Sequence, residues 1–400
     1  MKAIYIHLIV GARPNFMKMA PLYRELSLNQ DRYKPLIIHT GQHYDEKMSQ
    51  LFFNDLAMPK PSAYLNVGSG TQGKQTARII ERYEDLILSN AMPDLVIVAG
   101  DVNSTIACAL VAKKLQIPVA HLEAGLRSYD ESMPEEINRV LTDRVSDILL
   151  TPSLDANENL IKEGIKEEKI YFVGNIMIDS LFGHQKKAEL SNIIDTLDIN
   201  LAEGYTLVTL HRPSNVDEYD GLKMLLTSLV EIGKKIKIVF PMHPRTQKNI
   251  QGFGLSTFVN SNKNLIVTEP LGYLDFLKLE MNAKFILTDS GGIQEESTYF
   301  GVPCLTLREN TERPITIIEG TNQLVDLNVE SIVDSSLEII EGKVKKGTIP
   351  KYWDGKTAGR VVRVLDKWFE KRKEATESIK KIKVREDYED KGKDEGEKKN

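Results

Sequence analysis

Acidic side chains that follow short apolar runs are the residues best suited to chemistry. Asp101 and Glu123 each follow such a run, and Glu135 stands directly behind Pro134 at a predicted helix start. Carboxylates that converge on an anionic ligand repel each other, which raises their pKa values and suits them to proton transfer. These residues predict acid–base catalysis, although a glutamate in a first helical turn can simply complement the helix dipole.

A glycine-rich turn is the second chemical signal. The apolar run 285–288 leads into Ser290, Gly291 and Gly292, and a helical pattern follows. Such a turn binds phosphate because its free backbone N–H groups lie beside the positive end of the helix dipole. Glu296, one helical turn further on, is placed to accept both hydroxyl groups of a nucleotide's ribose. The turn can equally be an ordinary strand-to-helix connection.

Cations and histidines complete the candidate residues. Arg13 and Lys18 lie near a predicted helix start, where the helix dipole disfavours a cation unless an anion balances it. Arg313 follows a later apolar run and can neutralise a diphosphate. His211 and His243 also follow apolar runs, and a histidine can act as an acid near neutral pH or donate to phosphate. Each of these five can instead be an ordinary surface or loop residue.

These residues can act together only in a fold that brings the ends of several strands to one edge of a sheet. Short apolar, β-branched runs alternate with segments of helical period over residues 3–173, and the alternation resumes over residues 207–307. This pattern predicts an α/β fold with two doubly wound Rossmann-like domains, because single helices between short strands give parallel sheets that are buried on both faces. Ligands bind outside the carboxyl ends of such strands, so we expect the active site between the two domains.

The same pattern predicts the domain boundaries. The first domain covers residues 1–174, and the second, nucleotide-binding domain covers residues 175–356. Residues 181–204, between the two strand series, are polar and show no clear period. Residues 357–373 predict an amphipathic helix that packs back on the first domain, and the highly charged residues 374–400 predict a disordered tail.

Composition excludes several classes of protein. The 400 residues carry a formal net charge of -5, so no overall basic field exists to hold nucleic acid or an anionic membrane. No apolar stretch is long enough to span a bilayer, and the short apolar start runs into residues 11–14 instead of a cleavage site, so we expect a cytoplasmic protein. Cys108 and Cys304 are too few for a disulfide framework or a zinc site.

Neither a metal nor another cofactor is expected. His39 and His43, with the strand-end carboxylates, lack the spacing of a metal-binding motif. Residues 68–73 match the glycine pattern of dinucleotide-binding proteins. However, the strand before them would be very short, and the first acidic strand end, Asp101, lies too far downstream.

In combination, these motifs resemble the non-hydrolysing UDP-N-acetylglucosamine 2-epimerases. The matching segments are residues 11–14 with Lys18, 41–43, 100–101, 121–127, 134–139, 174–175, 211–212, 289–292 with Glu295 and Glu296, and 312–314. The resemblance implies a GT-B-like fold, a homodimer and an isomerase. It also implies cytosolic interconversion of UDP-N-acetylglucosamine and UDP-N-acetylmannosamine for polysaccharide precursors.

The resemblance also implies roles for individual residues. The catalytic groups that it implies are Asp101, Glu123, Glu135 and His211. The residues that it implies in contact with the nucleotide sugar are Arg13, Lys18, Asp101, Glu123, His211, Ser290, Gly291, Gly292, Glu296 and Arg313, with Phe276 on the uracil side. His243 joins the substrate-binding set from its place after a strand alone.

The chemistry of a sugar epimerisation fits these residue types. The C2 hydrogen has no neighbouring carbonyl group, so inversion needs either transient oxidation at C3 by NAD or elimination of UDP across C1–C2 and its re-addition. Elimination needs a base and an acid on opposite faces of C2, and strong stabilisation of the diphosphate. The candidate carboxylates and cations supply these groups, and either carboxylate can serve either face.

Three alternatives stay open on the sequence. Residues 44–45, 213–215 and 271–272 depart from the commonest pattern of the family and look more like the branch that acts on UDP-2,3-diacetamido uronic acids. A GT-B glycosyltransferase would use the same nucleotide turn and ribose glutamate to carry sugar to an acceptor. A UDP-sugar hydrolase would use the same site with water admitted.

Overall fold

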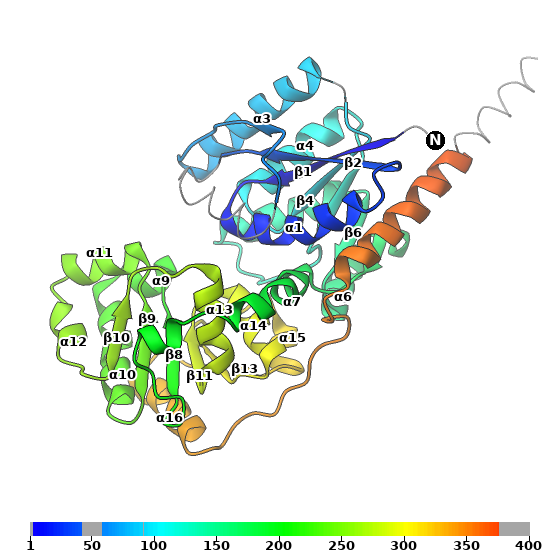
Figure 1. Ribbon diagram of the computed structural model, residues 1–400. Coiled ribbons are helices and arrows are strands. Elements are labelled where there is room, and N and C mark those ends of the chain that lie inside the picture. The colour runs from blue at the N-terminus through cyan, green and yellow to red at the C-terminus, as the bar shows by residue number, and fades with distance from the viewer. Residues whose placement is uncertain (1–2, 42–57, 91, 376–400) are drawn as a thin grey trace, which may run out of the picture.

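The computed structural model describes residues 3–41, 58–90 and 92–375. Two lobes, each built on one sheet, lie side by side (Figure 1). The strands of the first sheet are β1 (Ile4–Val10), β2 (Tyr33–His39), β3 (Ala63–Tyr64), β4 (Leu95–Ala99), β5 (Val119–Leu122), β6 (Ile148–Thr151) and β7 (Ile170–Phe172). The strands of the second sheet are β8 (Tyr205–Thr209), β9 (Lys237–Pro241), β10 (Leu265–Thr268), β11 (Phe285–Thr288), β12 (Cys304–Thr306) and β13 (Asn322–Leu324).

The two sheets share one topology. The seven-stranded sheet has the order β3-β2-β1-β4-β5-β6-β7, and the six-stranded sheet has the order β10-β9-β8-β11-β12-β13. Neighbouring strands are parallel in both sheets. The strand order reverses between β1 and β4 in the first sheet and between β8 and β11 in the second, which is where doubly wound sheets bind ligands. The predicted α/β fold of two Rossmann-like domains is confirmed.

Helices connect the strands of each sheet. The helices of the first lobe are α1 (Arg13–Ser27), α3 (Gln72–Ser89), α4 (Asn103–Lys114), α5 (Pro134–Val145) and α6 (Leu154–Lys162). The helices of the second lobe are α8 (Ile193–Thr196), α9 (Pro213–Val216), α10 (Tyr219–Gly233), α11 (Pro244–Gly252), α12 (Ser256–Asn260), α13 (Tyr273–Asn282), α14 (Gly291–Phe300), α15 (Pro314–Ile318) and α16 (Val329–Ile340). In α3 the buried residues recur every four positions, as in an amphipathic helix, whereas all five residues of the central strand β4 are buried.

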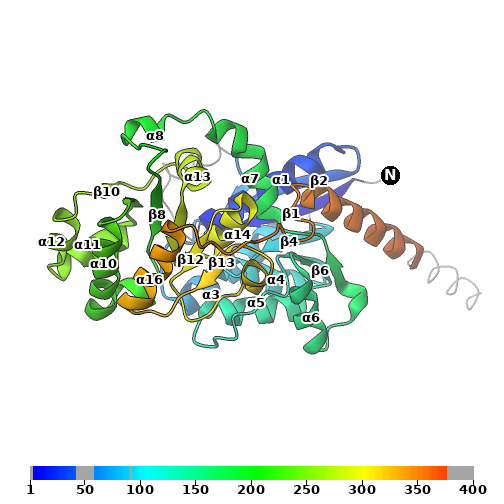
Figure 2. The ribbon, with the colours of Figure 1, turned by 90° about the horizontal axis from the view of Figure 1, so that it is seen from below.

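Helix α7 (Ile176–Ala188) joins the two lobes. It contacts α1 on one side and α13 and α14 on the other, and both views show it between the sheets (Figures 1 and 2). Residues 181–204, which show no clear period in the sequence, thus contain the second half of α7 and the whole of α8. The sequence hides α7 because the helix buries Asp179, Ser180 and His184 along with its apolar residues, so no single apolar face marks it.

Residues 357–375 form one long helix at the end of the described chain, drawn in orange-red in Figure 1. Leu365 of this helix is fully buried in the same apolar cluster as β1, β4 and α1. Asp179 of α7 accepts hydrogen bonds from the backbone N–H groups of Thr357 and Ala358 at 3.0 and 2.8 Å. The side chain thereby satisfies free donors at the start of the helix and ties it to α7.

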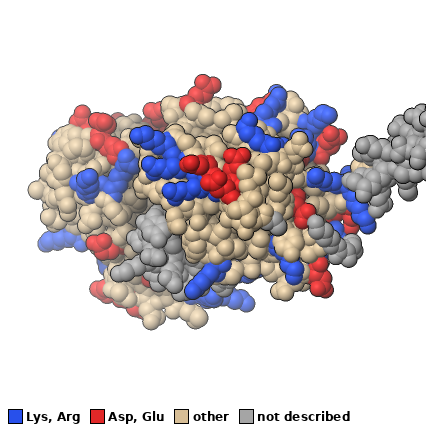
Figure 3. All heavy atoms as spheres, turned by 90° about the horizontal axis from the view of Figure 1, so that it is seen from above, with Lys and Arg blue, Asp and Glu red and all other residues tan. Residues whose placement is uncertain are grey.

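Several sequence expectations concern the surface and the chain ends. Residues 68–73 cover the end of the loop after β3 and the first two residues of α3. β3 is a two-residue edge strand, far from the reversal point of the sheet. No helix among the described residues is long and apolar enough to cross a membrane. Basic and acidic side chains are interspersed on the face drawn in Figure 3. Residues 42–43 of the matching motif and the tail beyond residue 375 lie outside the described residues.

Candidate active site

Glu123 combines an unusual backbone conformation with a buried ion pair. It follows β5 with φ at +69°, a left-handed conformation that is uncommon for residues other than glycine. Its side chain is 3% exposed and pairs with Lys18 of α1. Gly100 after β4 leaves room for this pair, because a Cβ there would lie 2.8 Å from the Lys18 Nζ. Backbone strain of this kind clusters at functional sites.

A buried network fixes the ends of β4 and β5 relative to each other. Nδ1 of His121 lies 2.6 Å from the Asp143 carboxylate, and Nε2 lies 2.8 Å from the carbonyl oxygen of Gly100. Asp143 also accepts a hydrogen bond from the N–H of Gly125 at 3.0 Å. Asp101 directly follows Gly100, and Glu123 lies two residues from both His121 and Gly125, so the network sets the relative position of the two carboxylates.

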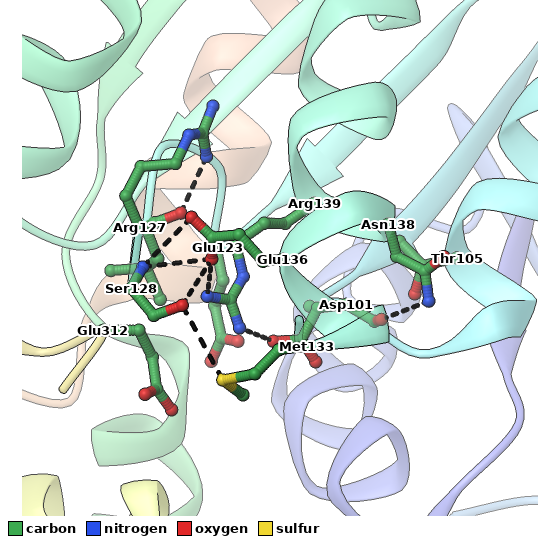
Figure 4. A network of polar contacts seen from close by, with 12 residues as sticks. Asp101, Thr105, Glu123, Arg127, Ser128, Met133, Glu136, Asn138, Arg139 and Glu312 are labelled. Atoms are coloured by element: carbon green, nitrogen blue, oxygen red, sulfur yellow. Dashed lines mark hydrogen bonds and ion pairs between the residues drawn. The ribbon is translucent and has the colours of Figure 1, made fainter. Parts of the chain in front are cut away.

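Asp101 is held by an arginine of α5 (Figure 4). Arg139 pairs with Asp101 and also with Glu136. Burial alone raises the pKa of Asp101, but the charges of Arg139 and Lys18 outweigh it and hold the pKa below its ordinary value. Glu136 in turn accepts a hydrogen bond from the N–H of Ser128 at 3.0 Å, so it anchors the arginine to the preceding loop.

Asp289 organises the corresponding edge of the second sheet. It follows β11, and its carboxylate accepts hydrogen bonds from the N–H groups of His211 and Arg212, both at 2.9 Å. Its other oxygen lies 2.8 Å from Nδ1 of His211. Burial alone raises the pKa of Asp289, but its hydrogen bond with His211 and the charge of that ring lower it. The carboxylate therefore orients an imidazole whose side chain is 41% exposed.

The glycine-rich turn packs directly against an arginine–glutamate pair. Ser290 is the N-cap of α14, and Gly291 and Gly292 are the first two residues of that helix. A Cβ at Gly291 would lie 2.5 Å from Nη1 of Arg313 and 2.7 Å from Oε1 of Glu312. The absence of a side chain therefore brings the guanidinium group beside the free N–H groups of the turn, an arrangement suited to a diphosphate.

Glu312 gathers three guanidinium groups around one carboxylate. Arg308, Arg313 and Arg212 lie 2.9, 2.5 and 3.7 Å from its oxygens. Burial alone would raise the pKa of Glu312, but the charges of Arg313 and Arg308 hold it well below its ordinary range. Three cations around one anion leave an excess of positive charge, which favours an anionic ligand.

Charge interactions of Glu295 cross from one lobe to the other. Glu295 lies on α14, is buried, and has one oxygen 2.9 Å from Nε of Arg313. Burial, with the like charge of Glu123, raises its pKa to about 7 against the opposing effect of the Arg313 charge. The two sheet edges thus face each other, and a buried carboxyl group that titrates near neutral pH is suited to acid–base chemistry.

Most of the residues predicted from sequence lie on these two facing edges. The first-lobe group is Lys18, Asp101 and Glu123, with Arg13 as the first residue of α1, and the second-lobe group is His211, Ser290, Gly291, Gly292 and Arg313. Apart from Arg13, for which the structure describes only its place on α1, these residues lie on the two facing edges, and their roles stay predictions.

The remaining predicted residues surround this set. Glu135 is half-buried in the first turn of α5. The ring of His243 lies 5.7 Å from that of His211. Phe276 of α13 packs against an apolar cluster of the second lobe. Glu296 is buried on α14, one residue after Glu295, which pairs with Arg313.

Sequence reasoning missed the partners that hold these groups. Arg139, Asp289, Glu295 and Glu312 carry the ion pairs and hydrogen bonds of the site; they lie in the matching motifs, but the sequence assigned them no role. A signal existed for Arg139, which lies three residues beyond Glu136 and so shares its helix face. Among the described residues, no group of three or more His, Cys, Asp or Glu side chains is arranged to hold a metal ion.

The glycine turn gives a matched pair of stability predictions. Gly291→Ala should lower the free energy of unfolding by about 1–2 kcal/mol, because the new methyl group displaces the buried Arg313–Glu312 pair. Gly292→Ala should leave it unchanged or raise it by ~0.5 kcal/mol, because nothing lies within 4 Å of a Cβ there. Urea unfolding without ligand measures both, and equal effects would contradict the close approach at Gly291.

The pKa of Glu295 predicts a pH-dependent stability difference. Between its ordinary value of 4.5 and about 7, the unfolded chain has lost a proton that the folded chain keeps, so this carboxyl group stabilises the fold less as pH rises. Glu295→Gln lacks this titration and should gain about 1–3 kcal/mol relative to the parent between pH 4.5 and 8. The exposed control Glu338→Gln should gain nothing, and parallel pH curves for Glu295→Gln and the parent would disprove the shift.

Comparison with known proteins identifies the family. A family model described as UDP-N-acetylglucosamine 2-epimerase matches residues 26–366. The UDP-N-acetylglucosamine 2-epimerase of Methanocaldococcus jannaschii is 44% identical over 364 residues, which cover 90% of this chain and 98% of that protein. The UDP-2,3-diacetamido-2,3-dideoxy-D-glucuronate 2-epimerase of Pseudomonas aeruginosa is 41% identical over 368 residues, which cover 90% and 98%.

A solved structure agrees with this assignment. The crystal structure of the Methanocaldococcus jannaschii UDP-GlcNAc 2-epimerase in complex with UDP-GlcNAc and UDP has a TM-score of 0.83 at 44% identity. The match covers 91% of this chain and 99% of that one. Both the order of the motifs and the two facing sheets are thus shared with known epimerases, and the chain belongs to the UDP-N-acetylglucosamine 2-epimerase family.

Proposed function

We propose that this chain interconverts UDP-N-acetylglucosamine and UDP-N-acetylmannosamine by eliminating UDP across C1–C2 and adding it back. The observation that supports the proposal is that two sheet edges with different side chains face each other. One edge presents a glycine turn with Arg313, and the other presents Asp101 and Glu123. A nucleotide sugar needs this combination, because its diphosphate requires cations and its C2 requires acids and bases.

The second lobe binds the nucleotide in this proposal. Ser290, Gly291, Gly292 and Arg313 meet the diphosphate. The backbone donors are the N–H groups of Gly291 and Gly292, because the N–H of Ser290 donates to the Thr288 hydroxyl group at 3.0 Å. Departure of UDP from C1 concentrates negative charge on the diphosphate, and cations fixed beforehand stabilise that charge without reorganising. Glu296 accepts the ribose hydroxyls, with Phe276 on the uracil side and His243 beside the phosphates.

The first lobe carries out proton transfer at C2. One carboxyl group among Asp101, Glu123 and Glu135 removes the C2 hydrogen, and a second group protonates the opposite face. Arg13 and Lys18 add positive charge near the leaving diphosphate. His211, oriented by Asp289, supplies a further proton donor.

Deuterium incorporation tests the function. Incubated with UDP-N-acetylglucosamine in deuterated water, the chain should yield UDP-N-acetylmannosamine with deuterium at C2, as measured by NMR and mass spectrometry. Asp101→Asn and Glu123→Gln remove the ionisable groups and should lower turnover about 100-fold or more while UDP still binds. Epimerised product without deuterium would refute elimination. An unchanged UDP-sugar would point to a glycosyltransferase, and release of free sugar to a hydrolase.

A second candidate substrate is a UDP-2,3-diacetamido uronic acid. Two observations favour it: the 41% identity to the Pseudomonas aeruginosa enzyme that acts on such a sugar, and the departure of residues 213–215 and 271–272 from the commonest family pattern. Parallel incubations with UDP-2,3-diacetamido-2,3-dideoxy-D-glucuronate and UDP-N-acetylglucosamine decide between them by the ratio of the kcat/KM values.

We further propose the setting in which the enzyme works. The proposed domains are residues 1–174 with the helix 357–373, and residues 175–356, followed by a charged tail at 374–400. A cytoplasmic location and a role in supplying polysaccharide precursors follow from the family resemblance, with no nucleic acid or membrane as partner. The net charge of -5 and the mixed charges on the drawn face support the absence of a nucleic-acid partner.

A homodimer is also proposed. On α5, Ile137, Val140 and Leu141 are exposed apolar residues at helical spacing, so one face of the helix is apolar and uncovered in the single chain. We expect light scattering to give the mass of two chains, and Leu141→Asp to give the mass of one, because a charge on this face would have to be buried at the interface. A monomeric parent chain would refute the dimer, and a dimeric variant would exclude this face.

A further inference from the structure

Glu280 is a fully buried acid without a cation. It lies on α13 with 0% of its surface exposed. Neither of its carboxyl oxygens receives a hydrogen bond from any residue in the described ranges. A buried polar group without a partner destabilises a fold, so one that is present in a native structure calls for an explanation.

The neighbour of Glu280 is Glu296, the proposed ribose ligand. Glu296 is also buried and lies on α14, which packs against α13. Burial and then the contact with Glu296 raise the pKa of Glu280 well above its ordinary value. Two touching carboxyl groups in a buried site cannot both be ionised, so the pair holds a proton.

Tyr273, which lies on α13 like Glu280, also contacts the Glu296 carboxylate. Its hydroxyl group donates a hydrogen bond to Oε1 of Glu296 at 3.0 Å. Tyr273 and Glu280 are seven residues apart on α13, which is two helical turns, and therefore share one face of the helix. The face of α13 that meets α14 thus presents two polar side chains to one carboxylate.

We propose that Glu280 is a positioning residue for nucleotide binding, which as a neutral carboxylic acid donates a hydrogen bond to Glu296. Together with Tyr273 it fixes the position from which the Glu296 carboxylate accepts the two ribose hydroxyl groups. Glu296 stays ionised, and an ionised acceptor binds hydroxyl groups more strongly than a neutral one. The inference rests on the proposed function, because it takes Glu296 as the ribose ligand.

Ribose discrimination tests the inference. Calorimetry measures the Kd of UDP and of 2′-deoxyuridine 5′-diphosphate, which lacks one ribose hydroxyl group. Glu280→Leu should weaken UDP binding about tenfold and reduce the preference for UDP, because the donor is lost. Glu280→Gln retains a donor in its amide group and should keep the preference. The matched control Asp155→Leu removes another carboxyl group whose oxygens are buried without a donor, on α6, and should also keep it.

Thermal unfolding adds a second measurement, in which Glu280→Leu should show a gain in stability beside its loss of UDP binding. Because burying a carboxyl group costs solvation free energy that a leucine side chain avoids, Glu280→Leu should raise the Tm even as it weakens UDP binding. A lower Tm with unchanged discrimination would show that Glu280 serves the fold and would overturn the inference. Equal UDP preference in Glu280→Leu and the parent would overturn it as well. A parent that binds both nucleotides equally well would instead refute the ribose role of Glu296, and the inference with it.

Discussion

Buried charge must be neutralised, and this constraint ties the chemistry of the site to the fold. Three ion pairs meet this constraint: Lys18 with Glu123, Arg139 with Asp101, and Arg313 with Glu295. Each pair joins a strand end or a loop to a helix elsewhere in the chain. The opposite charges therefore meet only when the helices have packed against the sheets. Removing one partner would leave an uncompensated charge, which destabilises a fold strongly. The groups proposed for catalysis therefore also hold the sheet edges in shape.

In each lobe, a glycine near the reversal point of the sheet leaves room for a charged side chain of an ion pair. Gly100 follows β4, Gly291 closely follows β11, and both strands lie next to the point where their sheet reverses. A Cβ at either glycine would meet a charged atom of an ion pair within 3 Å. In the proposed mechanism, the paired groups of the first lobe serve proton transfer on the sugar, and those of the second lobe bind the diphosphate. A shared topology thus supports unlike functions through the side chains that rest on one bare backbone position.

The sequence predicted local features well and non-local ones poorly. Residues 95–99 and 285–288 form strands with the predicted bounds, because short, fully apolar runs have few other solutions. Helix α7 escaped notice because it is buried from both sides. The sequence pattern pointed to Glu135, but Glu136 is the buried anchor, since the loop that contains Ser128 donates to it from outside the helix. Such a contact depends on tertiary packing, which no local pattern encodes.

The connection between the lobes has a mechanical consequence. The chain crosses between them twice, once through α7 and once through the segment after α16 that leads into residues 357–375 (Figure 1). Asp179 bonds the first crossing to the end of the second. Two crossings fastened at one place give the lobes a single short line of attachment, and a relative rotation of the lobes would have that line as its axis. In such a rotation, the parts of the two sheet edges that lie farthest from α7 would move apart most.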